Sequence, residues 1–184
     1  MRIVVGITGA SGSILAITLL KILRSLGLET HLIYSDWGKR TLELETNHTI
    51  DEVNTLASYT YREDDQAAPV SSGSFRHNGM VIVPCSMKTL SAVANGYADN
   101  LISRAADVTI KEGRKLILVT RESPLSAIHL ENMLKLARLG VTIMPPVPGF
   151  YAKPQTIEDI VHHSAGRILD QLGIEHNLIH RWGE

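Results

Sequence analysis

RIVVGITGASGSILAITLLKILRSLGL, residues 2–28, is the stretch that decides the fold of this chain. Residues 3–7 are an apolar, β-branched run bounded by glycines, which predicts a buried strand. Residues 14–26 carry leucine and isoleucine at helical spacing, which predicts a helix that buries one face. The glycine-rich residues 6–12 join the two. The stretch therefore predicts a β-turn-α unit, the building block of a parallel sheet covered by helices.

The same pattern recurs along the rest of the chain. Strand-like runs lie at residues 31–34, 80–84, 116–120 and 142–144. They alternate with helical patterns at about 37–45, at 89–96 followed by a longer helix that runs through Lys111, at 126–139 and at 157–172. The strands are continuous apolar runs, which is typical of a parallel sheet covered on both faces. We therefore expect a single domain over residues 1–184, an α/β doubly wound sandwich of the Rossmann-like or flavodoxin-like kind. Residues 64–74, rich in small and polar side chains, are expected to form a loop.

Composition narrows the class of protein. The 184 residues include 44% hydrophobic and 20% charged residues, and 18 Lys and Arg against 19 Asp and Glu give a net charge of -1. A global basic field for nucleic acid or anionic lipid is thereby excluded. Cys85 is the only cysteine, which excludes an internal disulfide and a cysteine-rich zinc site. With neither a signal-peptide pattern nor an apolar run of about 20 residues, we expect a cytoplasmic protein without a membrane span.

The chemistry is expected just after the strands, because ligands of doubly wound sheets bind beyond the carboxyl ends of the strands. Residues 6–12 allow backbone N–H groups to approach an anion at the start of a helix, and Ser11 adds a hydroxyl donor. Their glycines are spaced by three, which is not the dinucleotide fingerprint GxGxxG. A tight turn without a ligand therefore stays open as an interpretation.

Hydroxyl side chains follow two further strands. Ser35 comes after the second strand, and residues 85–89 offer two hydroxyls and a helix start for a phosphate or a flavin edge. Ser35 and Ser86 could equally be N-caps, which is the better interpretation for each alone. Their joint placement after successive strands favours a ligand site. Cys85 is expected to be a small buried apolar residue and not a nucleophile.

Charged residues supply a second group of candidates. Arg121 and Glu122 follow the strand at residues 116–120 and suit phosphate binding beside a proton-transfer group, or else an exposed ion pair. Arg104 and Lys111 are seven residues apart and share one helix face, which is also typical of a solvated face. Arg167 lies within the last helix, where a lone arginine is usually at the surface.

Many motifs, in order along nearly the whole chain, resemble the UbiX-type flavin prenyltransferases, in particular the branch that is associated with phenolic or hydroxyaryl acid decarboxylases. They are TGASG at 8–12, LET at 44–46, SSGSF at 71–75, PCSMKTL at 84–90, RAADV at 104–108, KE at 111–112, RE at 121–122, HLENML at 129–134, GFY at 149–151 and RW at 181–182.

The resemblance implies FMN as the cofactor and a set of residues for each ligand. The FMN positions would be Gly9, Ala10, Ser11, Ser35, Ser86, Met87, Lys88, Thr89 and Arg121. The catalytic set would be Glu45, Arg104, Lys111 and Glu122. The prenyl phosphate would be held by Lys111, Tyr151 and Arg167, with Trp182 as an aromatic side chain near the site.

The implied reaction joins a dimethylallyl group from dimethylallyl phosphate to N5 and C6 of reduced FMN. The prenylated FMN would serve a partner UbiD-type aromatic acid decarboxylase, and the enzyme would be a homo-oligomer, by resemblance a homododecamer. Lys111, Arg167 and the Tyr151 hydroxyl suit a departing phosphate without a metal, since the chain lacks the clustered aspartates that hold magnesium. Either Glu122 or the released phosphate could take the proton from C6.

Three other classes of function stay open. A direct aromatic acid decarboxylase would need an electron sink, and no residue set supplies one. A flavin-dependent cysteine decarboxylase would need its Asn and Met-Trp motifs, whereas Asn132 and Met133 lie in a different context. A flavin carrier would have no use for the prenyl-phosphate residues. The eight histidines, including the His162-His163 pair and the pair His176 and His180, are expected at the surface, so no metal site is predicted.

Overall fold

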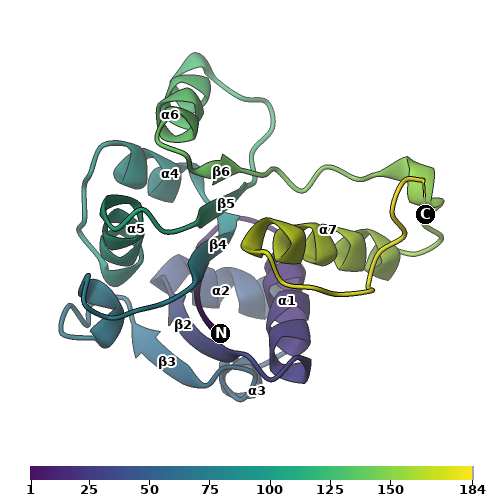
Figure 1. Ribbon diagram of the computed structural model, residues 1–184, viewed down its shortest axis with the longest axis horizontal. Coiled ribbons are helices and arrows are strands. Elements are labelled where there is room, and N and C mark those ends of the chain that lie inside the picture. The colour runs from purple at the N-terminus through teal and green to yellow at the C-terminus, as the bar shows by residue number, and fades with distance from the viewer. Residues whose placement is uncertain (184) are drawn as a thin grey trace.

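The computed structural model describes residues 1–183. Within this part, six parallel strands form one sheet in the order β3-β2-β1-β4-β5-β6 (Figure 1). The strands are β1 (Arg2–Ile7), β2 (Glu29–Tyr34), β3 (Tyr59–Arg62), β4 (Gly79–Cys85), β5 (Leu116–Thr120) and β6 (Thr142–Ile143). The helices are α1 (Ser13–Ser25), α2 (Asp36–Glu45), α3 (Ile50–Asn54), α4 (Met87–Ala94), α5 (Leu101–Lys111), α6 (Ala127–Arg138) and α7 (Ile157–Leu172), with 3-10 turns at Pro69–Ser71 and Phe150–Ala152. The doubly wound parallel sheet is thus confirmed.

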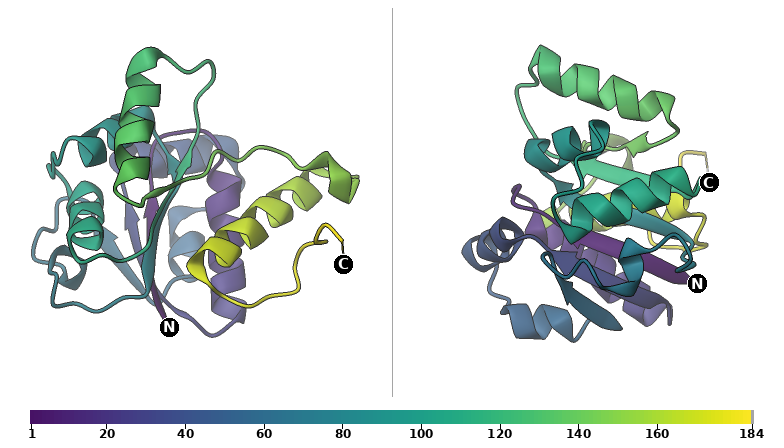
Figure 2. Two further views of the ribbon diagram at one scale, coloured as in Figure 1. Left: turned by 45° about the horizontal axis from the view of Figure 1, so that its top comes forward. Right: turned by 90° about the vertical axis from the view of Figure 1, so that its left-hand side faces the viewer.

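Each face of the sheet has its own hydrophobic core, because successive residues of a strand point to opposite faces. On β1, Val5 packs in the core that includes α1 and α7, whereas Val4 packs in the core that includes α4 and α5. Figure 2 shows α1 and α7 on one side of the sheet and α4 and α5 on the other. In the described part of the chain, no helix is long and apolar enough to cross a membrane.

The predicted strands and helices agree with the structure to within about two residues at most ends, but the sequence patterns predict no element over residues 46–63. The structure forms α3 and β3 there. β3 is an edge strand with the sequence YTYR, whose side chains are largely exposed, so it lacks the apolar run that indicates the other strands. Residues 64–74 form turns around the 3-10 turn Pro69–Ser71, as expected of a loop.

The middle of the sheet is where the chain reverses its direction of winding, and there Thr8 connects β1 to β4. The Thr8 hydroxyl donates to the carbonyl oxygen of Pro84 at 2.7 Å and accepts from the amide of Ser86 at 2.8 Å. The register of β4 against β5 shifts between Ile82 and Cys85, where Pro84 has no N–H to give to the ladder. The paired register of β1 and β4 ends at Gly6 and Ile82, and beyond it the Thr8 hydroxyl and the Thr8 amide, which donates to the Pro84 carbonyl oxygen at 3.3 Å, continue the contact between the two strands.

We predict that Thr8→Val lowers the free energy of unfolding by about 1–3 kcal/mol, because the Ser86 amide loses its buried hydroxyl acceptor and the Pro84 carbonyl keeps only the Thr8 amide. Valine has nearly the shape of threonine, so the change tests the hydrogen bonds and not the packing. Denaturant unfolding measures the difference. Thr60→Val, at an exposed position of β3, is the control and should change stability by less than about 0.5 kcal/mol. Equal effects of the two substitutions would contradict the assignment.

Candidate active site

Four of the segments predicted to carry chemistry meet at the carboxyl edge of the sheet. The turn after β1 reaches β4 through the Thr8 hydroxyl. The amide of Ser35, after β2, donates to the carbonyl oxygen of Ile7 at 2.9 Å, and the amide of Arg121, after β5, donates to the carbonyl oxygen of Cys85 at 3.2 Å. The starts of α1, α2 and α4 therefore lie around one edge, where their positive dipole ends favour an anion.

Gly9 allows the first turn to lie directly against α2. A Cβ atom at position 9 would overlap the Cβ atom of Trp37. Since a Cβ position follows the backbone, any side chain at Gly9 would push the two segments apart. Trp37 itself is exposed, with 71% of its surface accessible. Within this turn Gly9 and Ser11 are exposed, whereas Ala10 is buried.

The start of α1 is bound by a carboxylate from this chain. Oε2 of Glu45, the last residue of α2, accepts from the amides of Gly12 at 2.8 Å and Ser13 at 3.0 Å. Partial burial works to raise the pKa of Glu45, but hydrogen bonds from the Ser11 side chain and from these amides outweigh it and hold the pKa below its ordinary value. Glu45 is therefore a fixed anion beside Ser11.

The segment after β4 combines two hydroxyls with an inert thiol. The Ser86 hydroxyl accepts from the amide of Thr89 at 3.3 Å and lies 3.1 Å from the Thr89 hydroxyl, so it caps α4 as predicted. Met87 and Lys88 occupy the first turn of α4 between them. Cys85 is fully buried, as expected of a small apolar residue, and burial raises the pKa of its thiol to about 12.

Arg121 and Glu122 extend from the end of β5 into solvent. Both side chains are exposed, and Oε1 of Glu122 accepts from the amide of Ser123 at 3.0 Å. No ion pair joins Arg121 to Glu122 among the residues that the structure describes. The two side chains are therefore not paired with each other in this structure, and both are open to solvent.

Tyr151 and Arg167 share a second site, a groove of about 410 Å³ that lies beyond β6. The Tyr151 hydroxyl is 3.0 Å from Nε2 of His163, and its ring meets that of Trp182 edge to face at 5.6 Å between centroids. Nη1 of Arg167 donates to Oδ2 of Asp170 at 2.7 Å. The groove thus presents a hydroxyl and a guanidinium, which are donors suited to a phosphate.

Arg104 and Lys111 lie on α5, on the other side of the sheet from the α7 helix that carries Arg167. α5 begins beside the end of β3, where the amide of Leu101 donates to the carbonyl oxygen of Glu63, and it ends shortly before β5 begins. Lys111 therefore lies toward the amino edge of the sheet. One chain does not bring all of the residues expected around the prenyl phosphate together.

Three residues that connect the site are not predicted by the sequence patterns. Glu63 follows the unpredicted β3 and accepts from the amide of Asp36 at 2.8 Å, which joins it to the start of α2. His163 is expected at the surface, and only the fold brings it to Tyr151. Asp170 pairs with Arg167 at i,i+3 spacing, a signal that the sequence contains, and also with Arg181 at 2.8 Å, for which the sequence holds no signal.

Residues 1–169 match the family model described as Flavoprotein. The exposed Gly9, the hydroxyl side chains and the starts of α2 and α4 at one edge fit the phosphate and ring edge of a flavin. The fold and the site thus define an α/β flavoprotein.

The flavin prenyltransferase LpdB of Lactiplantibacillus plantarum is 56% identical to this chain over 98% of the chain and 97% of the relative. The chain belongs to the UbiX-like flavin prenyltransferases, as the resemblance in its motifs predicted.

Two solved structures share the fold almost without deviation. One is the dodecameric FMN-dependent UbiX-like decarboxylase from Escherichia coli O157:H7, with a TM-score of 0.98, 55% identity and coverage of 100% of both chains. The other is AnUbiX (PadA1) in complex with FMN and dimethylallyl pyrophosphate, with a TM-score of 0.98, 52% identity and coverage of 100% of this chain and 97% of that one.

We predict that Glu45→Gln destabilises the flavin-free protein by roughly 0.5 kcal/mol at pH 7, because the start of α1 loses its anion. The pKa of Glu45 is lowered in the folded state, so its contribution is present at neutral pH and is lost as the pH falls through that pKa, below about 4.5. Unfolding curves at several pH values measure the difference. Glu43→Gln, on the exposed face of α2, is the control. A difference that persists unchanged at low pH would contradict the role of the charge.

Proposed function

We propose that this chain joins the dimethylallyl group of dimethylallyl phosphate to N5 and C6 of reduced FMN. The observation that carries the proposal is the pairing of two sites: a flavin-type edge at the ends of β1, β2, β4 and β5, and a groove in which Tyr151 and Arg167 present phosphate-binding donors. A flavin carrier would need the first site and would have no use for the second. The family to which the chain belongs supports the same reaction.

The carboxyl edge of the sheet is the proposed FMN site. The groups that we assign to it are Gly9, Ala10, Ser11, Ser35, Ser86, Met87, Lys88, Thr89 and Arg121. Reduced FMN, when bound, supplies the two ring positions that receive the prenyl group. Helix starts and hydroxyls at this edge are suited to the anionic end of the cofactor, and the exposed Arg121 adds a positive charge.

Lys111, Tyr151 and Arg167 are the proposed phosphate-binding groups. Cleavage of the C–O bond places growing negative charge on the departing phosphate. Fixed cations and hydroxyl donors therefore stabilise the transition state more than the ground state. Arg104 adds a further positive charge, and no metal is needed in this arrangement. The ring of Trp182, packed on Tyr151, can stabilise an allylic cation through its π face.

Glu122 is the proposed base for the proton that leaves C6. Its carboxylate is exposed beyond β5 and is held at one oxygen by the amide of Ser123, which leaves the other oxygen available. Glu45 is proposed to act as a fixed anion beside the flavin, where it orients Ser11. The released phosphate remains the alternative base.

We further propose that the site is completed between chains of a homo-oligomer, by analogy a dodecamer. Arg104 and Lys111 lie across the sheet from Arg167, so a second copy is the source from which they can join the groove. The product would pass to a UbiD-type aromatic acid decarboxylase. The single cysteine suits a reducing compartment, and we place the enzyme in the cytoplasm.

The proposal is tested by anaerobic incubation of the protein with reduced FMN and either dimethylallyl monophosphate or the diphosphate. We expect the extracted flavin to gain the mass of one C5 unit, and the faster donor identifies the preferred substrate. Mass spectrometry measures the product. Unmodified FMN from folded, flavin-loaded protein with both donors would overturn the proposal and favour a thiol-oxidising decarboxylase or a flavin carrier.

We predict that Glu122→Gln retains FMN but forms the prenylated product about 10²-fold more slowly, which is the usual contribution of a general base at the low end of its range. Single-turnover mass spectrometry, with FMN binding followed by fluorescence, separates the two effects. Glu131→Gln, an exposed change on α6, is the matched control and should match the wild type. Wild-type turnover of Glu122→Gln would assign the proton transfer to the released phosphate.

A further inference from the structure

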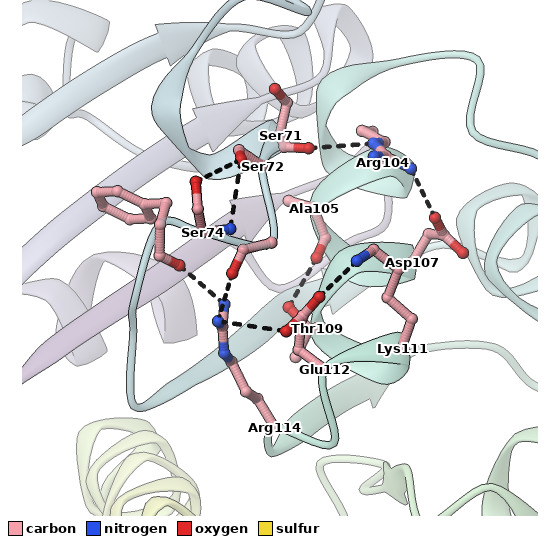
Figure 3. Close-up of polar contacts among 12 residues, drawn as sticks. Ser71, Ser72, Ser74, Arg104, Ala105, Asp107, Thr109, Lys111, Glu112 and Arg114 are labelled. Carbon is pink, nitrogen blue, oxygen red and sulfur yellow. Dashed lines mark hydrogen bonds and ion pairs between the residues drawn. The ribbon is translucent and has the colours of Figure 1, made fainter.

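The loop formed by residues 71–75 is held to α5 and the segment after it by arginine side chains that donate to its backbone (Figure 3). Nη2 of Arg114 donates to the carbonyl oxygen of Gly73 at 2.7 Å, and Nη1 donates to the carbonyl oxygen of Phe75 at 2.8 Å. At the other end of the loop, Nε of Arg104 donates to the carbonyl oxygen of Ser71 at 3.1 Å. Carbonyl groups at both ends and in the middle of the loop thus accept from a guanidinium.

Arg114 also lies next to the ion pair that holds Lys111. Nζ of Lys111 donates to Oε1 of Glu112 at 2.5 Å, while Nη2 of Arg114 lies 3.9 Å from Oε2 of that carboxylate. Lys111 lowers the pKa of Glu112 by its hydrogen bond and its charge, and Arg114 contributes less. Glu112 is therefore shared between two cations, one on each oxygen.

The loop and the ion pair are in direct contact at Gly73. A Cβ atom at position 73 would overlap Oε1 of Glu112 and would lie 2.9 Å from Nζ of Lys111. The backbone of the loop is therefore the surface against which the Lys111–Glu112 pair rests. Both cations of α5 that the proposed function assigns to the prenyl phosphate, Arg104 and Lys111, are placed by this loop.

The loop is also held at its last residue, Phe75, by contacts of the aromatic ring. The ring of Phe75 packs edge to face on His31 at 4.9 Å between centroids, and the guanidinium of Arg2 lies 4.7 Å from its centre. His31 is almost completely buried. The loop is thus fixed at Phe75 by packing, and Arg114 holds its backbone between Gly73 and Phe75 by hydrogen bonds to both carbonyl oxygens.

Arg114 differs from Arg104 and Lys111 in its access to solvent. Its side chain is only 16% exposed, against 36% for Arg104 and 47% for Lys111. Two of its nitrogen atoms already donate to carbonyl oxygens. Arg114 is therefore suited to hold other groups and not to meet a substrate.

We infer that Arg114 is a positioning residue for the prenyl-phosphate site, where it holds the 71–75 loop and, through Glu112, the Lys111 ammonium. The inference rests on the proposed function, because it is the phosphate that Lys111 and Arg104 would meet. Without Arg114 the loop loses two backbone contacts and Glu112 loses its second cation. Glu112 would then turn fully to Lys111 and reduce the charge that Lys111 presents.

The test measures the affinity for dimethylallyl monophosphate in assembled protein loaded with oxidised FMN, which does not accept the prenyl group. We expect Arg114→Gln to raise the Kd about tenfold in isothermal titration calorimetry, with FMN affinity unchanged. Hydrogen exchange at the amides of residues 72–75 should become faster. A merely structural defect would lower the fraction of binding-competent protein and leave the Kd of that fraction unchanged, which would overturn the inference.

Arg114→Lys keeps the charge and one donor, and it serves if Arg114→Gln does not fold. We expect it to recover part of the affinity, since a single ammonium cannot reach both carbonyl oxygens as a guanidinium does. The matched control is Arg76→Gln, because Arg76 is an exposed arginine that contributes its carbonyl oxygen, and not its guanidinium, to the contact with Arg2. The control should bind as the wild type does.

Lys111→Met separates failure of this inference from failure of the proposed function. If Lys111→Met weakens binding but neither change of Arg114 does, the proposed function stands and the positioning role is overturned. If the wild-type protein neither binds dimethylallyl monophosphate nor prenylates reduced FMN, the proposed function fails and the positioning role fails with it.

Discussion

The hydroxyl of Thr8 is the contact on which the arrangement of this protein's site depends. It connects β1 to the segment after β4 at the centre of the sheet. The strands β1 to β3 extend from this point toward one edge of the sheet, and β4 to β6 extend toward the other edge. A parallel sheet diverges at this point and leaves a crevice at its carboxyl edge. The paired register of β1 and β4 ends at Gly6 and Ile82, and beyond it the Thr8 hydroxyl and amide both donate to the Pro84 carbonyl oxygen and keep the two strand ends together. Ser86 is held directly by the Thr8 hydroxyl, and Ser35 is held to the same end of β1 through the carbonyl oxygen of Ile7.

Each edge of the sheet has its own group of charged side chains. The carboxyl edge already contains an anion of the chain, Glu45, at the start of α1, where the helix dipole favours negative charge. The C-terminal end of α5 gathers Lys111, Glu112 and Arg114 at the amino edge (Figure 3). Since α5 and the α7 helix that carries Arg167 lie on opposite sides of a sheet with two filled cores, the sheet separates their cations within one chain. The fold itself therefore favours a site shared between copies.

Some of the candidate residues have structural duties besides their proposed chemical ones. Ser35 and Ser86 cap α2 and α4 through their hydroxyls, so the capping interpretation and the flavin interpretation are compatible. Arg167 is oriented by Asp170, a carboxylate that also accepts from Arg181 and links α7 to the segment near Trp182. In each case the side chain is held before a ligand arrives, which reduces the entropy lost on binding.

The sequence by itself determined the doubly wound sheet, the glycine turn, the inert Cys85 and the family, because buried parallel strands and ordered motifs leave local patterns in the chain. It did not determine β3, whose polar edge sequence carries no such pattern, nor Glu63, which follows that strand. Only the tertiary structure placed His163 on Tyr151, Arg114 on the carbonyls of residues 73 and 75, and Arg104 and Lys111 across the sheet from Arg167. Those contacts join residues that are far apart in the chain, and several of them involve backbone carbonyl groups. Because every residue type has the same backbone carbonyl, the sequence does not indicate which carbonyl a side chain will bind.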